Sequence, residues 1–143
     1  MPDPQAESTF EHSTLQHDPP DGERHHALRA LYRELLRLRR ERPALAELSR
    51  EHLEVTADEA DDLLLVRRWH AADEAGLLLH FGSERATLTC PLPAGRWRKQ
   101  LDTAEACWLG EGSAVPGLVE STGRVQLTLG PRSAVLLTRA ERE

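Results

Sequence analysis

Seven histidines and two cysteines are the side chains of this sequence that could bind a metal ion or act as a nucleophile. Metal sites often take two ligands from a short spacing such as Cys-x-x-Cys or His-x-x-Glu-His, and neither occurs here. His25 and His26 are adjacent, and on a helix their side chains diverge by about 100°. We therefore predict no metal site and no cofactor. The histidines and cysteines of the sequence are His12, His17, His25, His26, His52, His70, His80, Cys90 and Cys107.

Signatures of catalysis are also missing from the sequence. It contains no Gly-x-Ser-x-Gly elbow, no P-loop and no dinucleotide-binding fingerprint. The acidic pairs Asp61-Asp62 and Asp73-Glu74 could act as general acids and bases, but both pairs fall in predicted turns. Carboxylates in turns are usually solvated, so we expect no catalytic residue in this chain.

Three tryptophans could stack on sugar rings, because a flat aromatic face packs well on a pyranose. Trp69 and Trp97 lie in predicted strands, where we expect them to contribute to the core or to a sheet face. Trp108 lies in a glycine-rich stretch instead. It is the tryptophan that we predict as a ligand contact.

Length and charge limit the function classes that this chain can belong to. Its 143 residues suit one domain that buries about two thirds of its unfolded surface. A net charge of −6 argues against bulk attraction to nucleic acid or to an anionic membrane. The apolar runs are strand-sized and the N-terminus resembles no secretory signal. We expect a cytoplasmic protein in which Cys90 and Cys107 are free thiols.

Residues 24–45 form the segment with the strongest helical periodicity. Asp21 and Glu23 suit the start of a helix, and Pro43 ends it at about Arg42. Arg39 interrupts the apolar face, so we expect it either to reach solvent along the last turn or to meet a buried carboxylate. The apolar face contains Leu28, Leu31, Tyr32, Leu35, Leu36 and Leu38.

An arginine ridge lies opposite the apolar face of this helix. Such a ridge could contact a polynucleotide, but no aromatic side chains are interleaved with it, and Glu34 and Glu41 flank it. A solvated or intramolecularly paired face is the interpretation that we favour. The ridge consists of Arg29, Arg33, Arg37 and Arg40.

Residues 1–23 contain four prolines and two large apolar residues, Phe10 and Leu15. Proline interrupts both helices and sheets, so no regular element is expected here. Two interpretations stay open. The segment is either a disordered leader or an ordered irregular loop that Phe10 and Leu15 hold against a larger body.

Residues 46–143 change to a period of about two, which is typical of strands. Turn-forming residues separate the segments, and this pattern predicts an antiparallel β-sandwich. A further short strand is expected around Leu118. The fold class is therefore mainly β, preceded by an irregular loop and one amphipathic helix. The predicted strands are 53–56, 63–69, 76–82, 86–90, 96–101, 124–129 and 133–139.

Several phrases of the sequence resemble the malto-oligosyltrehalose trehalohydrolase family of the α-amylase superfamily (glycoside hydrolase family 13). Residues 2–5 (PDPQ), 9–10 and 13–15 resemble the segment after the last barrel strand. Residues 32–40 with 43–45 are similar to the last barrel helix, and residues 63–68, 76–82, 93–97 and 130–137 to the C-terminal β-sandwich.

This resemblance implies that the chain is the C-terminal portion of such an enzyme. Members hydrolyse the α-1,4 bond next to the terminal trehalose of maltooligosyl trehalose, through carboxylates on barrel strands upstream of the matched region. The chain alone is then expected to be inactive and to have the catalytic (β/α)8 barrel as its partner. Asp3 and Gln5 are the residues implied to lie near the substrate cleft.

The second hypothesis is a free-standing sandwich that binds an α-glucan or a protein partner without catalysis. Trp108 would then be the sugar contact. Under either hypothesis the apolar face of the helix needs a cover, because a contiguous apolar patch rarely stays open on a monomer. Self-association through the helix is the third partner that we consider.

Overall fold

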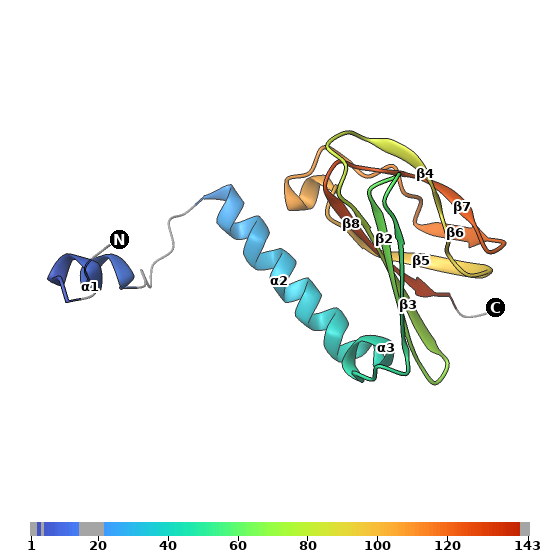
Figure 1. Ribbon diagram of the computed structural model, residues 1–143, viewed down its shortest axis with the longest axis horizontal. Helices are drawn as coiled ribbons and strands as arrows, with labels where there is room; N and C mark the ends of the chain where they lie inside the picture. Colours follow the sequence, from blue (N-terminus) through green and yellow to red (C-terminus); the bar gives the residue numbers. More distant parts are fainter. Residues whose placement is uncertain (1–2, 4, 15–21, 141–143) are drawn as a thin grey trace.

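The computed structural model describes residues 3, 5–14 and 22–140, in which eight antiparallel strands follow three helices (Figure 1). The predicted mainly β, antiparallel fold is thereby confirmed. The helices are α1 (Glu7–Ser13), α2 (Glu23–Glu41) and α3 (Pro43–Ala46), and a 3-10 helix, η1 (Ala106–Trp108), precedes β6. The strands are β1 (Leu53–Asp58), β2 (Leu63–His70), β3 (Asp73–His80), β4 (Ala86–Cys90), β5 (Gly95–Asp102), β6 (Leu118–Ser121), β7 (Val125–Leu129) and β8 (Ser133–Arg139).

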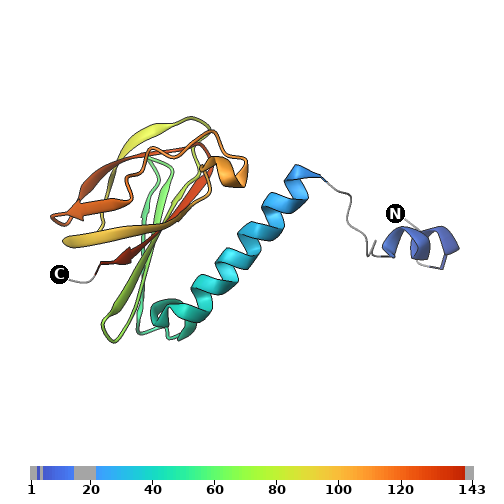
Figure 2. The same cartoon turned by 180° about the vertical axis from the view of Figure 1, so that it is seen from behind.

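Helix α1 corrects the expectation that residues 1–23 contain no regular element. The prolines of this segment lie outside Glu7–Ser13, so nothing in that stretch interrupts a helical turn. The Thr9 hydroxyl donates to the carbonyl of Asp3 at 2.6 Å and thereby ties down the helix start. Both views show α1 lying apart from the sandwich (Figures 1 and 2). Leu15 and Asp21 lie outside the described residues.

The predicted helix ends close to the predicted position at about Arg42, whereas residues 43–45 belong to a second, short helix. Helix α2 ends at Glu41, and Arg42 is extended with φ −103° and ψ 112°. Pro43 imposes this break, because a proline disfavours the helical conformation of the residue before it. The chain then restarts as α3, in which Pro43 occupies the first turn.

The strands form a six-stranded sheet in the order β1-β2-β3-β8-β5-β6 and a two-stranded sheet of β4 and β7. The small sheet covers one face of the large sheet, and α2 and α3 lie against the opposite face (Figures 1 and 2). The inner strands of the large sheet therefore face two layers, whereas the edge strand β1 is exposed along its length. This explains why β2, β3 and β8 are apolar on both faces rather than strictly alternating.

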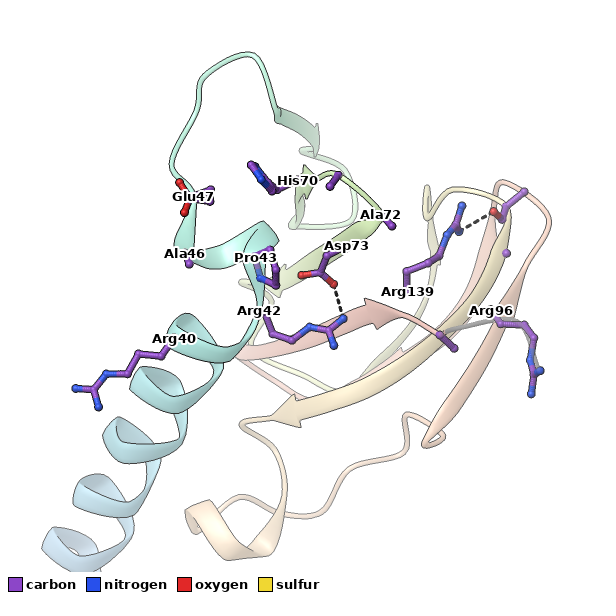
Figure 3. Close-up of a pocket in the computed structure, with 14 residues that line it drawn as sticks. Arg40, Arg42, Pro43, Ala46, Glu47, His70, Ala72, Asp73, Arg96 and Arg139 are labelled. Atoms are coloured by element: carbon purple, nitrogen blue, oxygen red, sulfur yellow. Dashed lines mark hydrogen bonds and ion pairs between the residues drawn. The ribbon is translucent and has the colours of Figure 1, made fainter.

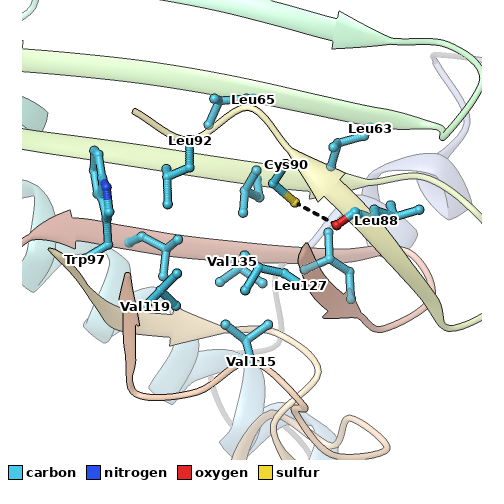
Figure 4. Close-up of a cluster of buried hydrophobic side chains, with 13 residues drawn as sticks. Leu63, Leu65, Leu88, Cys90, Leu92, Trp97, Val115, Val119, Leu127 and Val135 are labelled. Atoms are coloured by element: carbon cyan, nitrogen blue, oxygen red, sulfur yellow. Dashed lines mark hydrogen bonds between the residues drawn. The ribbon is translucent and has the colours of Figure 1, made fainter. Parts of the chain in front are cut away.

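The main core lies between the two sheets (Figure 4). Trp97 is its largest side chain and is 0% exposed, while its indole N–H donates to the carbonyl of Pro93 at 2.9 Å. Cys90 is a free thiol inside this core, and its burial raises its pKa to about 11. Leu92 joins this core from the connection between β4 and β5, and the residues from the two sheets include Leu63, Leu65, Leu78, Leu88, Val119, Leu127, Leu129, Val135 and Leu137.

A smaller core lies between the large sheet and the helices. Leu38 of α2 and Ala44 of α3 contribute to it, as do Ala75, Leu101 and Leu136 of the sheet. Strand β5 contributes to both cores because its register against β8 shifts between Lys99 and Leu101. This β-bulge turns Leu101 toward the helices, whereas Trp97 on the same strand faces the small sheet.

Candidate functional site

A groove of about 1350 Å³ opens where the helices meet the large sheet (Figure 3). Its walls come from the α2–α3 break, the β2–β3 turn, the start of β5 and the end of β8, so distant segments meet here. Five of its side chains are basic and two are acidic, the latter being Glu47 and Asp73. The basic side chains are Arg40, Arg42, His70, Arg96 and Arg139.

Asp73 fastens the helices to the sheet at one end of this groove. The guanidinium of Arg42 donates to one carboxylate oxygen, and the amide of Ala44 donates to the other at 3.0 Å. The Ala44 amide belongs to the first turn of α3, where amides have no partner within the helix, and Asp73 caps it from another element. We call this arrangement the Asp73 clasp. The expectation of a solvated turn carboxylate is wrong here.

Glu74, next to the clasp, holds two arginines on the opposite face of the sheet. It accepts a hydrogen bond from Nε of Arg67 at 2.5 Å and pairs with Nε of Arg139 at 3.3 Å. Burial lowers the pKa of Arg67, but hydrogen bonds to Glu74 and Glu54 outweigh this and raise it above its ordinary value. Glu74 is buried, so the prediction that it is solvated is also wrong.

Arg139 is held by further contacts within the chain. Its guanidinium lies 5.0 Å above the ring of Trp97 and donates to the carbonyl of Ala94 at 2.8 Å. Gly95 makes this approach feasible, because a Cβ there would lie 2.3 Å from the guanidinium, and its φ of +140° strains any other residue. Arg42 and Arg139 of the groove thus already bind carboxylate and carbonyl groups of this chain. Their geometry suits anchoring rather than acid–base chemistry.

We predict that Asp73→Ala loosens the helices from the sheet. The substitution removes the Arg42 pair and the cap of α3, and should lower the free energy of unfolding by about 2 kcal/mol. Urea unfolding measures this loss, and hydrogen exchange should speed up at the amides of residues 38–46. Asp73→Asn keeps an oxygen for the Ala44 amide and should lose about half as much. Equal protection of the α3 amides in wild type and Asp73→Ala would contradict the clasp.

The second feature of the helices is an apolar side that the sandwich leaves open. Leu31 and Leu38 face the sheet, whereas four other large apolar side chains of α2 are exposed, one of which, Leu35, also lines the cavity beside the sheet. We call these four the exposed α2 stripe: Leu28, Tyr32, Leu35 and Leu36, which are 49%, 61%, 42% and 49% exposed. Even the sheet-facing side is loosely filled, since an apolar cavity of about 310 Å³ lies between α2 and the sheet. The sandwich therefore satisfies only part of the apolar face.

The arginines of α2 behave partly as the sequence predicts. Arg37 of the ridge forms intrahelical ion pairs with Glu34 and Glu41, which confirms pairing for this residue. The hydrogen bond from Arg37 holds the pKa of Glu34 below its usual value, and the two carboxylates raise the pKa of Arg37. Arg39 is exposed, so it does not meet a buried carboxylate. Arg42, three residues later, pairs instead with a partly buried carboxylate, that of Asp73.

The predicted ligand contacts are not brought together. Trp108 on η1 is partly buried against the cluster of Leu38 and Leu101, with its indole N–H buried and unpartnered among the described residues. Asp3 and Gln5 lie beside α1, where the Asp3 carboxylate accepts from the backbone N–H of Gln5 at 3.0 Å. This is a local turn contact. Sequence reasoning missed the pairing of Asp73 with Arg42 and of Glu74 with Arg139, because these arginines are distant from the carboxylates in sequence.

Within residues 3, 5–14 and 22–140, no three His, Cys, Asp or Glu side chains gather in a way that could hold a metal ion. None of the helices in the same residues is long and apolar enough to cross a membrane.

Comparison with known sequences places most of this chain in an existing family. Residues 51–136 match the family described as "Domain of unknown function (DUF3459)". The chain is also 38% identical over 138 residues to malto-oligosyltrehalose trehalohydrolase from Deinococcus radiodurans. This match covers 96% of the chain and 20% of the relative, in its C-terminal part. The chain thus spans about a fifth of the length of that relative.

Solved structures of larger enzymes contain a similar fold. Trehalulose synthase MutB from Pseudomonas mesoacidophila MX-45 superposes with a TM-score of 0.54 at 18% identity, over 78% of this chain and 17% of that one. An α-amylase from Anoxybacillus gives a TM-score of 0.53 at 18% identity, over 77% of this chain and 22% of that one. At such identities the likeness shows the fold alone.

Proposed function

This chain belongs to the DUF3459 family of domains, and we propose that it serves as the non-catalytic C-terminal portion of a malto-oligosyltrehalose trehalohydrolase. The observation that carries the proposal is the identity of 38% across 96% of the chain, against only 20% of the relative. In the proposed whole, a catalytic barrel hydrolyses the α-1,4 bond next to the terminal trehalose of maltooligosyl trehalose. The role of this chain is to brace that barrel.

The surface of α2 supports a bracing role. The sandwich covers Leu31 and Leu38 but leaves the exposed α2 stripe open. The helix therefore has one apolar side that contacts the sandwich and a second that can contact the proposed barrel. The Asp73 clasp fixes the end of the helix to the sheet, which gives a barrel seated on the stripe a firm connection to the sandwich. A surface that mainly anchors and docks fits a brace better than an active site.

The position of Trp108 gives less support to the second hypothesis, α-glucan binding by a free-standing sandwich. Its ring packs beside α2 in the smaller core and so offers little open face to a sugar. Asp3 and Gln5 stay candidates for contact near the cleft of the proposed barrel, since they belong to the segment that precedes the helix. Cytoplasmic localisation is likewise part of the proposal.

A reconstitution experiment tests the proposal. The purified chain is mixed with the Deinococcus radiodurans relative from which the matched C-terminal portion has been deleted. We expect this chain to bind the truncated relative. Trehalose should be released from maltooligosyl trehalose only in samples that contain the truncated relative. Tyr32→Glu should weaken binding about 30-fold, because it places a charge in an apolar contact.

Phe81→Glu is the matched control, since Phe81 is also 61% exposed but lies outside α2. It should leave the affinity nearly unchanged. Trehalose release by the chain alone would refute the non-catalytic role. Binding of maltooligosaccharide by the chain alone, lost in Trp108→Ala, would instead support the glucan-binding hypothesis.

A further inference from the structure

The exposed α2 stripe has no cover in the described part of the chain. On a helical wheel its four residues fall within an arc of about 100°, beside the arc that faces the sheet. Their exposure of 42% to 61% makes them one continuous apolar strip along the helix. Since contiguous apolar surface of this kind marks a docking site, the question is which chemistry fits it.

The rim of this stripe is basic. Arg24 and Arg29 flank it near the start of α2, Arg40 flanks it near the end, and Arg39 lies in line with it one turn beyond Leu35; all four arginines are exposed. The carboxylates of Glu34 and Glu41 lie on the far side, where Arg37 engages them. A second copy of α2 laid on the stripe would oppose like charges along its length, which disfavours such pairing. The occupant must combine an apolar centre with acidic flanks.

The segment that precedes α2 has this chemistry. Residues 1–23 contain six Asp and Glu and neither Lys nor Arg, whereas residues 24–42 contain seven Arg and two Glu. Within α1 the side chain of Phe10 is 75% exposed, and Glu7 and Glu11 both lie beside it on one side of the helix. None of the residues of α1 is buried, so the helix has a free apolar side chain and free acids.

We propose that the exposed α2 stripe is a docking surface for α1 of the same molecule, with Phe10 seated between Leu28 and Tyr32. Nine residues, 14–22, connect the helices and can span up to about 30 Å. Leu28 lies about 8 Å along α2 from its start, well within this reach. The short tether also holds α1 at a high effective concentration. The separated arrangement in Figures 1 and 2 is then the open state of a pair.

Docking of α1 gives the chain a cover for its apolar helix that needs no second protein. It is independent of the barrel proposal, because it involves α1 and α2 of the isolated chain alone. A body that binds the stripe has to displace α1 first. The stripe therefore stays shielded until a better apolar partner is present.

Photo-cross-linking of the full chain tests this inference. Benzoylphenylalanine replaces Phe10, and mass spectrometry locates the cross-links after irradiation. We expect cross-links to residues 28–36 within single molecules, with a yield that is constant over a roughly tenfold range of protein concentration. Raising NaCl from about 0.02 M to about 0.5 M should lower the yield at least about threefold, because salt screens the charges.

Matched charge variants separate a specific contact from a general charge effect. Glu7→Lys with Glu11→Lys should lower the yield at least about threefold, since it turns the acidic side of α1 basic. Glu51→Lys with Glu59→Lys changes the net charge equally at exposed positions outside α1 and α2, and should leave the yield unchanged. Thermal unfolding of the sandwich should be the same in both, because α1 buries no residue.

The remaining outcomes overturn the inference. Cross-linked dimers that increase with protein concentration would assign the stripe to a second copy. Cross-links to the sandwich alone, no cross-links, or an equal loss of yield in both charge variants would show that α1 does not dock on α2.

Discussion

Trp97→Ala should lower the free energy of unfolding by about 4 kcal/mol, the largest effect that we expect from a single substitution in this chain. Trp97 is fully buried between the two sheets, so truncation leaves a cavity lined by core residues that can collapse only partly. It also leaves the carbonyl of Pro93 and the guanidinium of Arg139 without the indole. Urea unfolding followed by far-UV circular dichroism measures the loss.

Trp69→Ala is the matched control for this prediction. Trp69 is only partly buried, and its ring contacts Arg67 at 4.7 Å and His52 at 5.9 Å near the groove end of β2. The same chemical deletion should therefore cost about 1 kcal/mol there. If the two substitutions cost the same, Trp97 does not occupy the closed core described here.

Glu74→Gln should lower the free energy of unfolding by about 3 kcal/mol, the second largest effect. The Glu74 side chain is 12% exposed and faces two guanidinium groups, so neutralising it leaves two partly buried cations around one amide. The loss should persist at about 0.5 M NaCl, because salt screens buried pairs weakly. The midpoint of urea unfolding at low and high salt measures both effects.

Glu54→Gln provides the comparison for the buried pair. Glu54 pairs with Arg67 at 2.7 Å, but its side chain is 55% exposed. Exposed pairs contribute little, so this variant should lose less than about 1 kcal/mol, and salt should abolish the loss. An effect of Glu54→Gln as large as that of Glu74→Gln would mean that the burial of Glu74 plays no part.

The fold could be predicted where one local signal decides the structure. Alternating apolar residues revealed the strands, including the short one at Leu118, and Pro43 marked the break after α2. The same signals cannot show which strands become neighbours, since the order β3-β8-β5 joins segments distant in the chain. They also cannot show the bulge near Gln100, because one unpaired residue changes the face of a strand without changing its composition.

The candidate site was less predictable because its contacts are tertiary. Asp73 and Glu74 are residue types that are common in turns, yet both lie in β3. Folding brings Arg42 next to Asp73 and Arg139 next to Glu74 from distant positions in the chain. The helical wheel correctly identified an arginine at odds with the apolar face. Arg39 nonetheless stays in solvent, because the side of α2 on which it lies is the side that the sandwich leaves open.

Helix α1 shows a different limit of sequence reasoning. Prolines on both sides of Glu7–Ser13 made the whole segment look irregular, although a proline affects only the residues next to it and about one helical turn. For Trp108 the error is the opposite one, because an exposed position was predicted and the structure is more closely packed. Glycines around it suggest an open loop, yet η1 folds back so that the ring meets α2.

The Asp73 clasp also has a mechanical meaning. It joins the end of α2 to the first residue of β3, and β3 is bonded on one side to β2 and on the other to β8. A force applied to the helix therefore enters the sheet at an inner strand rather than at an edge that could peel away. A protein that binds α2 consequently sets the orientation of the whole sandwich, because the helix and the sandwich move together.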